Sequence, residues 1–126
     1  MLEKDLHTLI CVYIRTNYPD AIFRSDFASG MRMSIGMAKR NKSLQSSRAY
    51  PDIFIAEPKG EYYGMFIELK TKDNIVYKKD GTLRQNEHHK EQAVMLMKLN
   101  NRGYKAVFGQ GYQDTIKQID KYFECN

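Results

Sequence analysis

The sequence contains no tryptophan, and its 126 residues include only three prolines and two cysteines. The two cysteines, Cys11 and Cys125, are too few and too far apart for a secreted disulfide-stabilised scaffold. Every apolar run is shorter than the ~20 residues that a membrane-spanning helix needs. Glu3 and Asp5 place acidic charge where a secretory signal peptide would be basic or apolar. We therefore expect a cytoplasmic protein with reduced cysteines and no membrane partner.

Acidic residues are missing from one long stretch, because no aspartate or glutamate occurs between Asp26 and Asp52. The whole chain has 20 Lys and Arg against 15 Asp and Glu, a formal net charge of +5. One-sided positive charge favours contact with a polyanion such as nucleic acid, and a solvated basic surface is the alternative. We expect nucleic-acid contacts from the five basic residues of this stretch, which are Arg32, Lys39, Arg40, Lys42 and Arg48.

The remaining composition is that of a folded domain, with 42% hydrophobic and 28% charged residues and a mean hydropathy of -0.62. The length suits one domain with one core, so we expect residues 1–126 to form a single domain. Apolar residues recur at three- and four-residue steps over residues 2–16 and predict a helix there. Helices are also predicted around residues 34–45, over residues 85–101 and after Gly111.

Short β-branched and aromatic runs predict four strands. Turn residues at 58–61 separate the second and third runs, which predicts an antiparallel hairpin. The predicted helix between the third and fourth runs indicates a parallel crossover. The sequence thus favours an α/β or α+β fold in which a mixed central sheet is flanked by helices. The four runs are residues 21–27, 51–56, 62–70 and 105–108.

The third predicted strand is apolar except for Glu68 and Lys70. Side chains alternate along a strand, so these two charges point to the same face. Asp52 opens the preceding strand and reaches the same end of the sheet if the two strands pair. Buried charges are costly unless they are paired or bound to a metal, and two carboxylates with a backbone carbonyl suit Mg²⁺ or Mn²⁺. The pattern indicates either such a cation pocket beside a lysine, or a weak surface pair facing solvent.

Asp52 follows a proline, and Glu68-Leu69-Lys70 comes sixteen residues later, which resembles the PD-(D/E)xK nuclease signature. The order of motifs over nearly the whole chain resembles the VRR-NUC branch of that superfamily, which contains small phage and bacterial nucleases. That branch has a glutamine in the helix after its ExK motif, where this chain has Gln92, eleven residues before Gly103.

The same branch has a glutamate early in its first helix, and Glu3 occupies that position. It also has a glutamine four residues further on, where this chain carries His7. This departure leaves Asp5 as a substitute for Glu3. A zinc site built from His7, Cys11 and the His88–His89 pair fits no common ligand spacing.

The resemblance implies a restriction-endonuclease-like core and metal-dependent hydrolysis of phosphodiester bonds in DNA. Asp52, Glu68 and the Leu69 carbonyl would hold Mg²⁺ or Mn²⁺, and Glu3 would reach the ion directly or through water. Lys70 would orient the attacking water and stabilise charge on the phosphate. Gln92 would fix the geometry of the lysine or the water.

Stand-alone members of the branch look like homodimeric junction resolvases. The resemblance therefore implies a homodimer that acts on branched DNA, such as a Holliday junction, in a bacterium or a phage-infected cell. Two alternatives remain at the level of sequence. The protein is either a non-catalytic basic module that binds nucleic acid, or a flap- or nick-directed nuclease of the same superfamily.

Overall fold

The computed structural model of the chain describes residues 1–26, 32–84 and 86–126. The helix bounds agree with the predicted ones to within two residues, and the four predicted strands are all present. The expected strand at 21–27 ends at Phe27, which lies outside the described residues. The elements in chain order are α1 (Glu3–Asn17), β1 (Phe23–Ser25), α2 (Ile35–Ser43), β2 (Ile53–Ile55), β3 (Met65–Lys70), α3 (Glu87–Asn100), β4 (Lys105–Gln110) and α4 (Gly111–Phe123).

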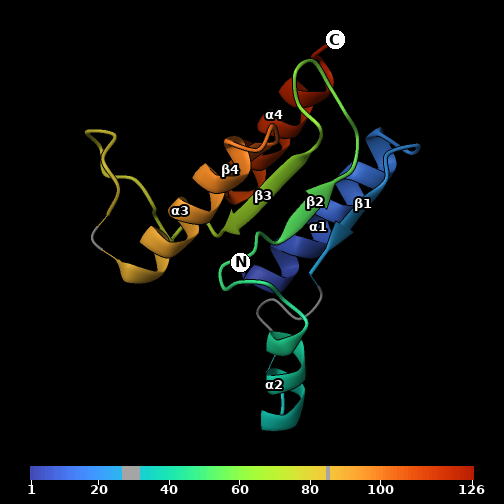
Figure 1. The fold of residues 1–126 in the computed structure, drawn as a ribbon. Helices are drawn as coiled ribbons and strands as arrows, with labels where there is room; N and C mark the ends of the chain where they lie inside the picture. Colours follow the sequence, from blue (N-terminus) through green and yellow to red (C-terminus); the bar gives the residue numbers. More distant parts are fainter. Residues whose placement is uncertain (27–31, 85) are drawn as a thin grey trace.

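The four strands form one mixed sheet in the order β1-β2-β3-β4 (Figure 1). β2 pairs antiparallel with both β1 and β3, and β3 pairs parallel with β4. The helix α3 connects these two parallel strands. The predicted hairpin and the predicted parallel crossover are therefore confirmed. β2 is shorter than residues 51–56, although the Asp26 N–H donates to the Asp52 carbonyl and the Ala56 N–H donates to the Ile22 carbonyl, just beyond its ends.

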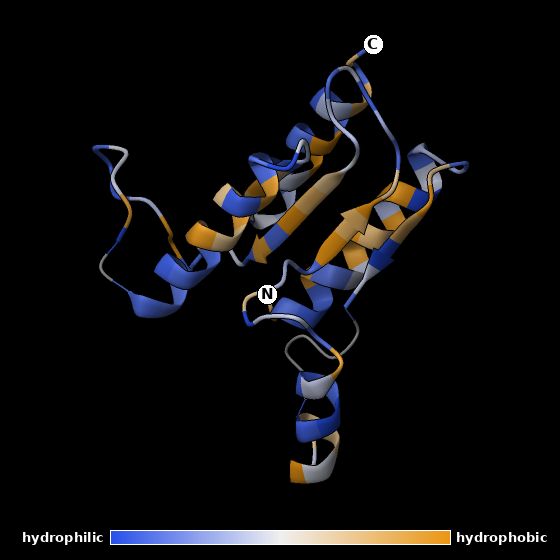
Figure 2. Cartoon of the chain, viewed as in Figure 1, coloured by the Kyte–Doolittle hydropathy of each residue, from blue (hydrophilic) through white to orange (hydrophobic). Residues whose placement is uncertain are grey.

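One face of the sheet is covered by α1 and α4. Every third or fourth residue of α1 is apolar, so its buried face packs on the strand side chains that alternate toward it. This main core consists of Leu6, Ile10, Ile14, Ile53, Ile55, Met65, Ile67, Leu69, Ile119 and Tyr122. The strands are mostly coloured hydrophobic in Figure 2, and a hydrophilic segment interrupts β3 near its end. The hydroxyls of Tyr13 and Tyr18 both donate to the Asp120 carboxylate and connect α1 to α4.

The opposite face is covered by α3 and by the loop that precedes it. Phe66 packs there with Leu96 of α3 and with Val76, which is fully buried in that loop. Met65, Ile67 and Leu69 face α1 and α4, whereas Phe66 faces α3. The strand alternation expected from the sequence is therefore confirmed, and it places Glu68 and Lys70 on the α3 side.

α2 projects from the end of the sheet near which the chain begins (Figure 1). The Ser34 side chain caps this helix by accepting a hydrogen bond from the Met37 N–H. None of its residues, Ile35 to Ser43, is buried, and its colouring in Figure 2 is mostly hydrophilic. Packing therefore contributes little to this helix, and its sequence is free to serve contacts outside the core.

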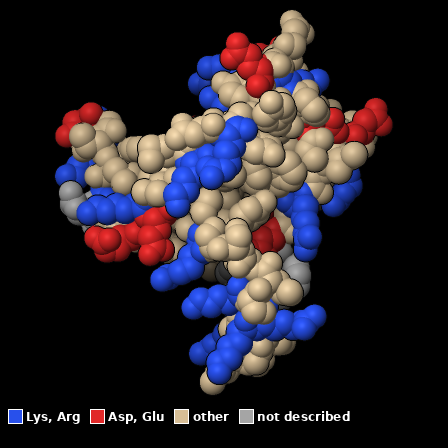
Figure 3. All heavy atoms as spheres, in the orientation of Figure 1, with Lys and Arg blue, Asp and Glu red and all other residues tan. Residues whose placement is uncertain are grey.

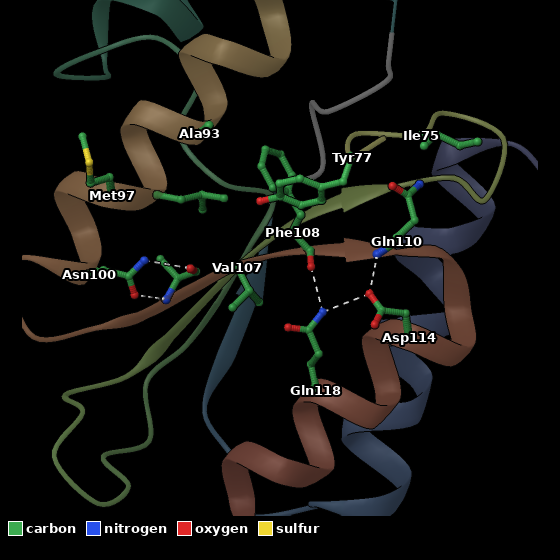
Figure 4. Close-up of a pocket in the computed structure, with 12 residues that line it drawn as sticks. Ile75, Tyr77, Ala93, Met97, Asn100, Val107, Phe108, Gln110, Asp114 and Gln118 are labelled. Atoms are coloured by element: carbon green, nitrogen blue, oxygen red, sulfur yellow. Dashed lines mark hydrogen bonds between the residues drawn. The ribbon is translucent and has the colours of Figure 1, made fainter. Parts of the chain in front are cut away.

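The outer edge of β4 is lined by polar side chains. Asn100 pairs with both backbone groups of Ala106, at 2.9 Å to the N–H and 3.0 Å to the carbonyl. Gln118 donates to the Phe108 carbonyl at 2.8 Å, and Asp114 accepts from the Gln110 N–H at 2.9 Å (Figure 4). Side chains of α3 and α4 thus replace a fifth strand along this edge.

Both cysteines are free thiols. Within the part of the chain that the structure describes, no helix combines the length and the apolar character needed to cross a membrane.

Candidate active site

The carboxyl end of β3 and the start of β2 meet at one point of the sheet. Ile53 is paired with Ile67, so the preceding Asp52 lies beside Glu68. The Leu69 N–H donates to Asp52 Oδ2 at 2.7 Å, which fixes this carboxylate against the end of β3. The sequence prediction that Asp52 reaches the end of the sheet near Glu68 is thus met by the geometry.

Glu68 and Lys70 are almost completely buried, with 5% and 4% of their surfaces exposed. The alternative that they form a surface pair facing solvent is therefore wrong. Burial of a carboxylate and an ammonium in the same region is sustained only when charges and hydrogen bonds compensate each other. Two buried charges in a core of this size therefore mark this end of the sheet as a candidate functional site.

Gln92 approaches the same carboxylate from α3. Its Nε2 atom donates a hydrogen bond to Glu68 Oε1 and lies 3.2 Å from the Nε2 atom of His88, one helical turn away. Within the described residues, Glu68 Oε2 and Gln92 Oε1 are buried without a hydrogen-bond partner. Buried oxygens rarely lack a hydrogen-bond partner, so these two atoms can accept a hydrogen bond or bind a cation.

The pKa of Glu68 is raised strongly, first because burial disfavours the charged form. The neighbouring charge of Asp52 raises it further and Glu3 adds a smaller contribution, whereas Lys70 opposes the shift. The pKa of the buried His89 is lowered by burial and then by the charge of Lys70. The charges of Asp52, Glu68 and Lys70 are therefore close enough to influence one another's protonation.

α1 contributes a third side to this region. Ligand atoms of Glu3, His7 and Asp52 all lie within 4.8 Å of one another. His7 is buried, and its Nε2 atom is 3.7 Å from Asp52 Oδ2. Asp5, the sequence-level substitute for Glu3, is exposed and does not belong to this group.

The donor set fits a divalent cation. Carboxylates from Asp52, Glu68 and Glu3 are hard oxygen ligands of the kind that Mg²⁺ and Mn²⁺ prefer. The mutual repulsion of these acids and the partnerless Glu68 Oε2 atom are what a site for a positive ion requires. Leu69 lies between the two buried charges of β3, so its carbonyl is at the same end of the strand.

The basic stretch lies close to this end of the molecule. Lys39, Arg40 and Lys42 are exposed on α2, and Lys and Arg side chains gather over that helix in Figure 3. Arg32 is exposed just before α2. Arg48, which follows the helix, lies 3.8 Å from Glu91 of α3 and forms an exposed ion pair. The stretch therefore extends from a projecting helix to the element that carries Gln92.

A groove lined by several apolar side chains lies elsewhere in the molecule. It has a volume of about 730 Å³ and lies along β4, between α3 and α4 (Figure 4). Its walls include Tyr77, Met97 and Phe108, and Asp114 is the one acidic side chain among the described residues that line it. This groove lacks the converging carboxylates that bind a divalent cation, so we place the candidate active site at the acidic cluster of Glu3, Asp52 and Glu68.

A solved structure described as a VRR_NUC domain protein superimposes on this chain with a TM-score of 0.61 and 22% sequence identity. The match covers 100% of this chain and 91% of that chain. No protein-family model and no curated protein sequence matches the chain. The resemblance to the VRR-NUC branch expected from the sequence is therefore confirmed at the level of the fold, together with the α+β class.

Sequence reasoning missed the three histidines as members of this region. It treated His7 as a departure from a pattern, yet His7 lies with Glu3 and Asp52. The signal was present, because residues four apart lie on the same face of a helix. His88 is likewise four residues before Gln92, whereas the burial of His89 next to Lys70 follows only from the tertiary packing.

Proposed function

We propose that this protein is a metal-dependent endonuclease that hydrolyses phosphodiester bonds in DNA. The observation that carries the proposal is the convergence of two buried carboxylates, Asp52 and Glu68, with the buried Lys70 and Gln92. This arrangement joins the start of β2, the end of β3 and the middle of α3. The shared fold with a VRR_NUC domain protein supports the same conclusion.

Each residue has a role that its position supports. Asp52, Glu68 and the Leu69 carbonyl would hold Mg²⁺ or Mn²⁺, and Glu3 would contact the ion directly or through water. Such a cation, when bound, polarises the phosphodiester and acidifies the attacking water. Lys70 would orient that water and stabilise the negative charge that develops on the phosphate. Gln92 keeps the Glu68 carboxyl in a fixed orientation through its hydrogen bond.

The basic stretch supports DNA as the substrate. Arg32, Lys39, Arg40, Lys42 and Arg48 are all exposed, and α2 projects from the end of the sheet that carries the acidic cluster. Basic side chains that flank a cluster of acids attract the phosphates on both sides of the scissile one. Positive charge outside and negative charge inside is the distribution that a cation-dependent nuclease needs.

We further propose that the preferred substrate is branched DNA, such as a four-way junction, and that the enzyme acts as a homodimer. A four-way junction has two symmetric cleavage points, and a twofold dimer presents two sites with the same relation.

Cleavage of labelled duplex, flap, fork and four-way junction substrates, with Mg²⁺, with Mn²⁺ and with a chelator, tests the proposal. Asp52→Asn and Glu68→Gln should abolish metal-dependent cleavage, because neutral amides do not balance the charge of a dication. Glu61→Gln, at an exposed residue before β3, is the matched control and should cleave like the wild type. DNA binding without cleavage by the wild type, under every metal condition, would instead identify a non-catalytic binding module.

The dimer is tested separately. Sedimentation analysis of the protein with an uncleaved junction in Ca²⁺ should show two chains per junction. A fully active complex with one chain per junction would contradict the dimer and leave the nuclease assignment intact. Preferential cleavage of flaps or nicks would instead identify a flap- or nick-directed nuclease of the same superfamily.

A further inference from the structure

His7 has a side-chain nitrogen that the fold leaves unused. The residue is 7% exposed, and within the described residues its Nε2 atom has no hydrogen-bond partner. That atom points toward Asp52, with 3.7 Å between Nε2 and Oδ2. This distance is too long for a hydrogen bond, so a direct contact with the carboxylate does not satisfy the nitrogen. A buried polar atom in this condition costs free energy unless a ligand supplies its partner.

The other ring nitrogen is held by β1. His7 Nδ1 lies 3.2 Å from the hydroxyl oxygen of Ser25. When Nδ1 carries the proton and donates it to that oxygen, Nε2 keeps its lone pair and is available to a metal ion. Metal-binding histidines are commonly oriented by such a partner on the second nitrogen. Ser25 therefore positions the imidazole and leaves Nε2 as the free ligand atom.

The spacing of the three α1 and β2 side chains suits one cation. Two ligand atoms about 2.1 Å from one octahedral ion lie about 3.0 Å apart in adjacent positions and about 4.2 Å apart in opposite ones. The 3.7 Å between Nε2 of His7 and Oδ2 of Asp52 is less than the larger value, so one ion can contact both atoms, and a shift of about 0.7 Å brings them to the adjacent spacing. Glu3, one helical turn from His7, has a ligand atom within 4.8 Å of both.

We propose that His7 is a metal ligand and that the site therefore prefers a first-row transition-metal dication, such as Mn²⁺ or Co²⁺, to Mg²⁺. This assignment names a further ligand of the proposed nuclease site and rests on that function, because Asp52 belongs to both. An imidazole nitrogen is a poor ligand for Mg²⁺, and it strengthens binding along the series from Mn²⁺ to Co²⁺ and beyond. Glu3 and Asp52 complete a mixed nitrogen and oxygen site.

The first test measures cation binding without DNA. Free Mn²⁺ is followed by electron paramagnetic resonance during titration, and Mg²⁺ affinity is obtained by competition. His7→Gln should weaken Mn²⁺ binding at least tenfold and change Mg²⁺ affinity by less than about twofold, since an amide oxygen replaces the nitrogen. Equal loss for both ions, or no loss for either, would overturn the proposal, as would the absence of Mn²⁺ binding by the wild type.

The second test observes the ligand directly. Pulsed electron paramagnetic resonance of the Mn²⁺-loaded protein should show coupling to an imidazole nitrogen. The coupling should disappear in His7→Gln and persist in His88→Gln, which removes a second histidine of the same region, beside Gln92. Coupling that survives in His7→Gln, or that is absent from the wild type, would refute the assignment.

Ser25 provides a variant that leaves the proposed ligand in place. Ser25→Ala should reduce Mn²⁺ affinity by about 10- to 100-fold, the range reported for partners of metal-binding histidines, and Ser25→Thr should restore it. An unchanged Mn²⁺ affinity in Ser25→Ala would show that Ser25 does not position the ring. Since the hydroxyl of Ser25 also interacts with the thiol of Cys11, Cys11→Ala is the control for loss of that contact alone.

The cation tests and the cleavage tests fail independently. A protein that shows nitrogen coupling to Mn²⁺ but cleaves no DNA would retain the metal assignment and lose the nuclease. A protein that cleaves DNA without nitrogen coupling would retain the nuclease and lose His7 as a ligand.

Discussion

Gln92 of α3 donates a hydrogen bond to Oε1 of Glu68 on β3, and both side chains are buried. The two residues are 24 positions apart in the chain, and the parallel crossover brings them together. An amide donor serves a neutral carboxyl as well as a carboxylate, so this contact is compatible with either protonation state of Glu68.

The first prediction concerns the dependence of stability on pH without a metal. Burial and the charge of Asp52 raise the pKa of Glu68 well above its ordinary value of 4.5. Above pH 4.5 the unfolded chain releases this proton while the folded state keeps it, so the free energy of unfolding falls as pH rises toward the raised pKa. Glu68→Gln should remove this loss, and its stability advantage over the wild type should grow between pH 5 and pH 8.

Chemical unfolding at several pH values in the presence of a chelator measures that difference, and about 1.4 kcal/mol per pH unit is the upper limit for one proton. Glu61→Gln, at an exposed carboxyl, should show no such trend. A difference between Glu68→Gln and the wild type that stays constant across this interval would show that Glu68 is ionised in the folded protein.

The second prediction separates the charge of Lys70 from metal binding. Lys70→Met keeps the aliphatic stem in the core and removes the ammonium. We expect cleavage to slow by roughly 10²–10³-fold, because a charge aligned with the developing negative charge is lost. Mn²⁺ affinity should change little, and Lys72→Met, at an exposed position two residues later, should behave like the wild type. Parallel losses of metal affinity and rate would point to a structural ion pair.

The third prediction tests the basic stretch on α2. Each phosphate contact contributes about −0.9 to the slope of log affinity against log salt concentration on duplex DNA. Replacing Lys39, Arg40 and Lys42 together with alanine should weaken binding and reduce the magnitude of that slope by up to ~3. Equilibrium binding to an uncleaved junction in Ca²⁺, titrated across salt, measures both.

The control for that variant removes the same charge from another surface. Lys98, Lys117 and Lys121 are exposed on α3 and α4 and can be replaced together. This triple variant should retain the wild-type slope. If the salt slope fell by the same amount in both triple variants, the effect would come from net charge and α2 would have no special role.

The fourth prediction concerns packing between β4 and α4. A Cβ atom added at Gly109 would overlap the hydroxyl of the buried Thr115 and approach Ile67 Cγ2 to 3.1 Å. Gly109→Ala should therefore lower the free energy of unfolding by about 1–3 kcal/mol. Gly36, inside the exposed α2, has no atom within 4 Å of the added carbon. Gly36→Ala should be neutral or stabilise the helix by about 0.5–1 kcal/mol, and urea denaturation compares the two.

Most of the fold follows from local patterns. Apolar spacing identified α1, and good helix formers identified α3. The turn at residues 58–61 identified the hairpin, because loop length and turn residues restrict how two strands pair. Strand ends were less accurate, as for Tyr63, whose N–H bonds to Gly103 rather than to a neighbouring strand. Contacts of that kind depend on where distant parts of the chain lie.

The candidate site was predictable where strand alternation decides it. Glu68 and Lys70 had to share a face, and Asp52 followed from the hairpin. The burial of both charges and the position of His7 were not predictable, because both depend on how α1 and α3 pack at the end of the sheet. The pattern could not show that a residue outside the expected motif would occupy the same region as Glu3.

The side chains along β4 restrict how copies of this chain can associate. An unpaired strand edge is a template for another strand, and it allows sheets to grow without limit. Asn100, Gln118 and Asp114 already occupy backbone groups of that edge, so a second strand would have to displace them. Growth of the sheet from β4 into fibres or open filaments is therefore disfavoured, because each added strand would have to break these hydrogen bonds.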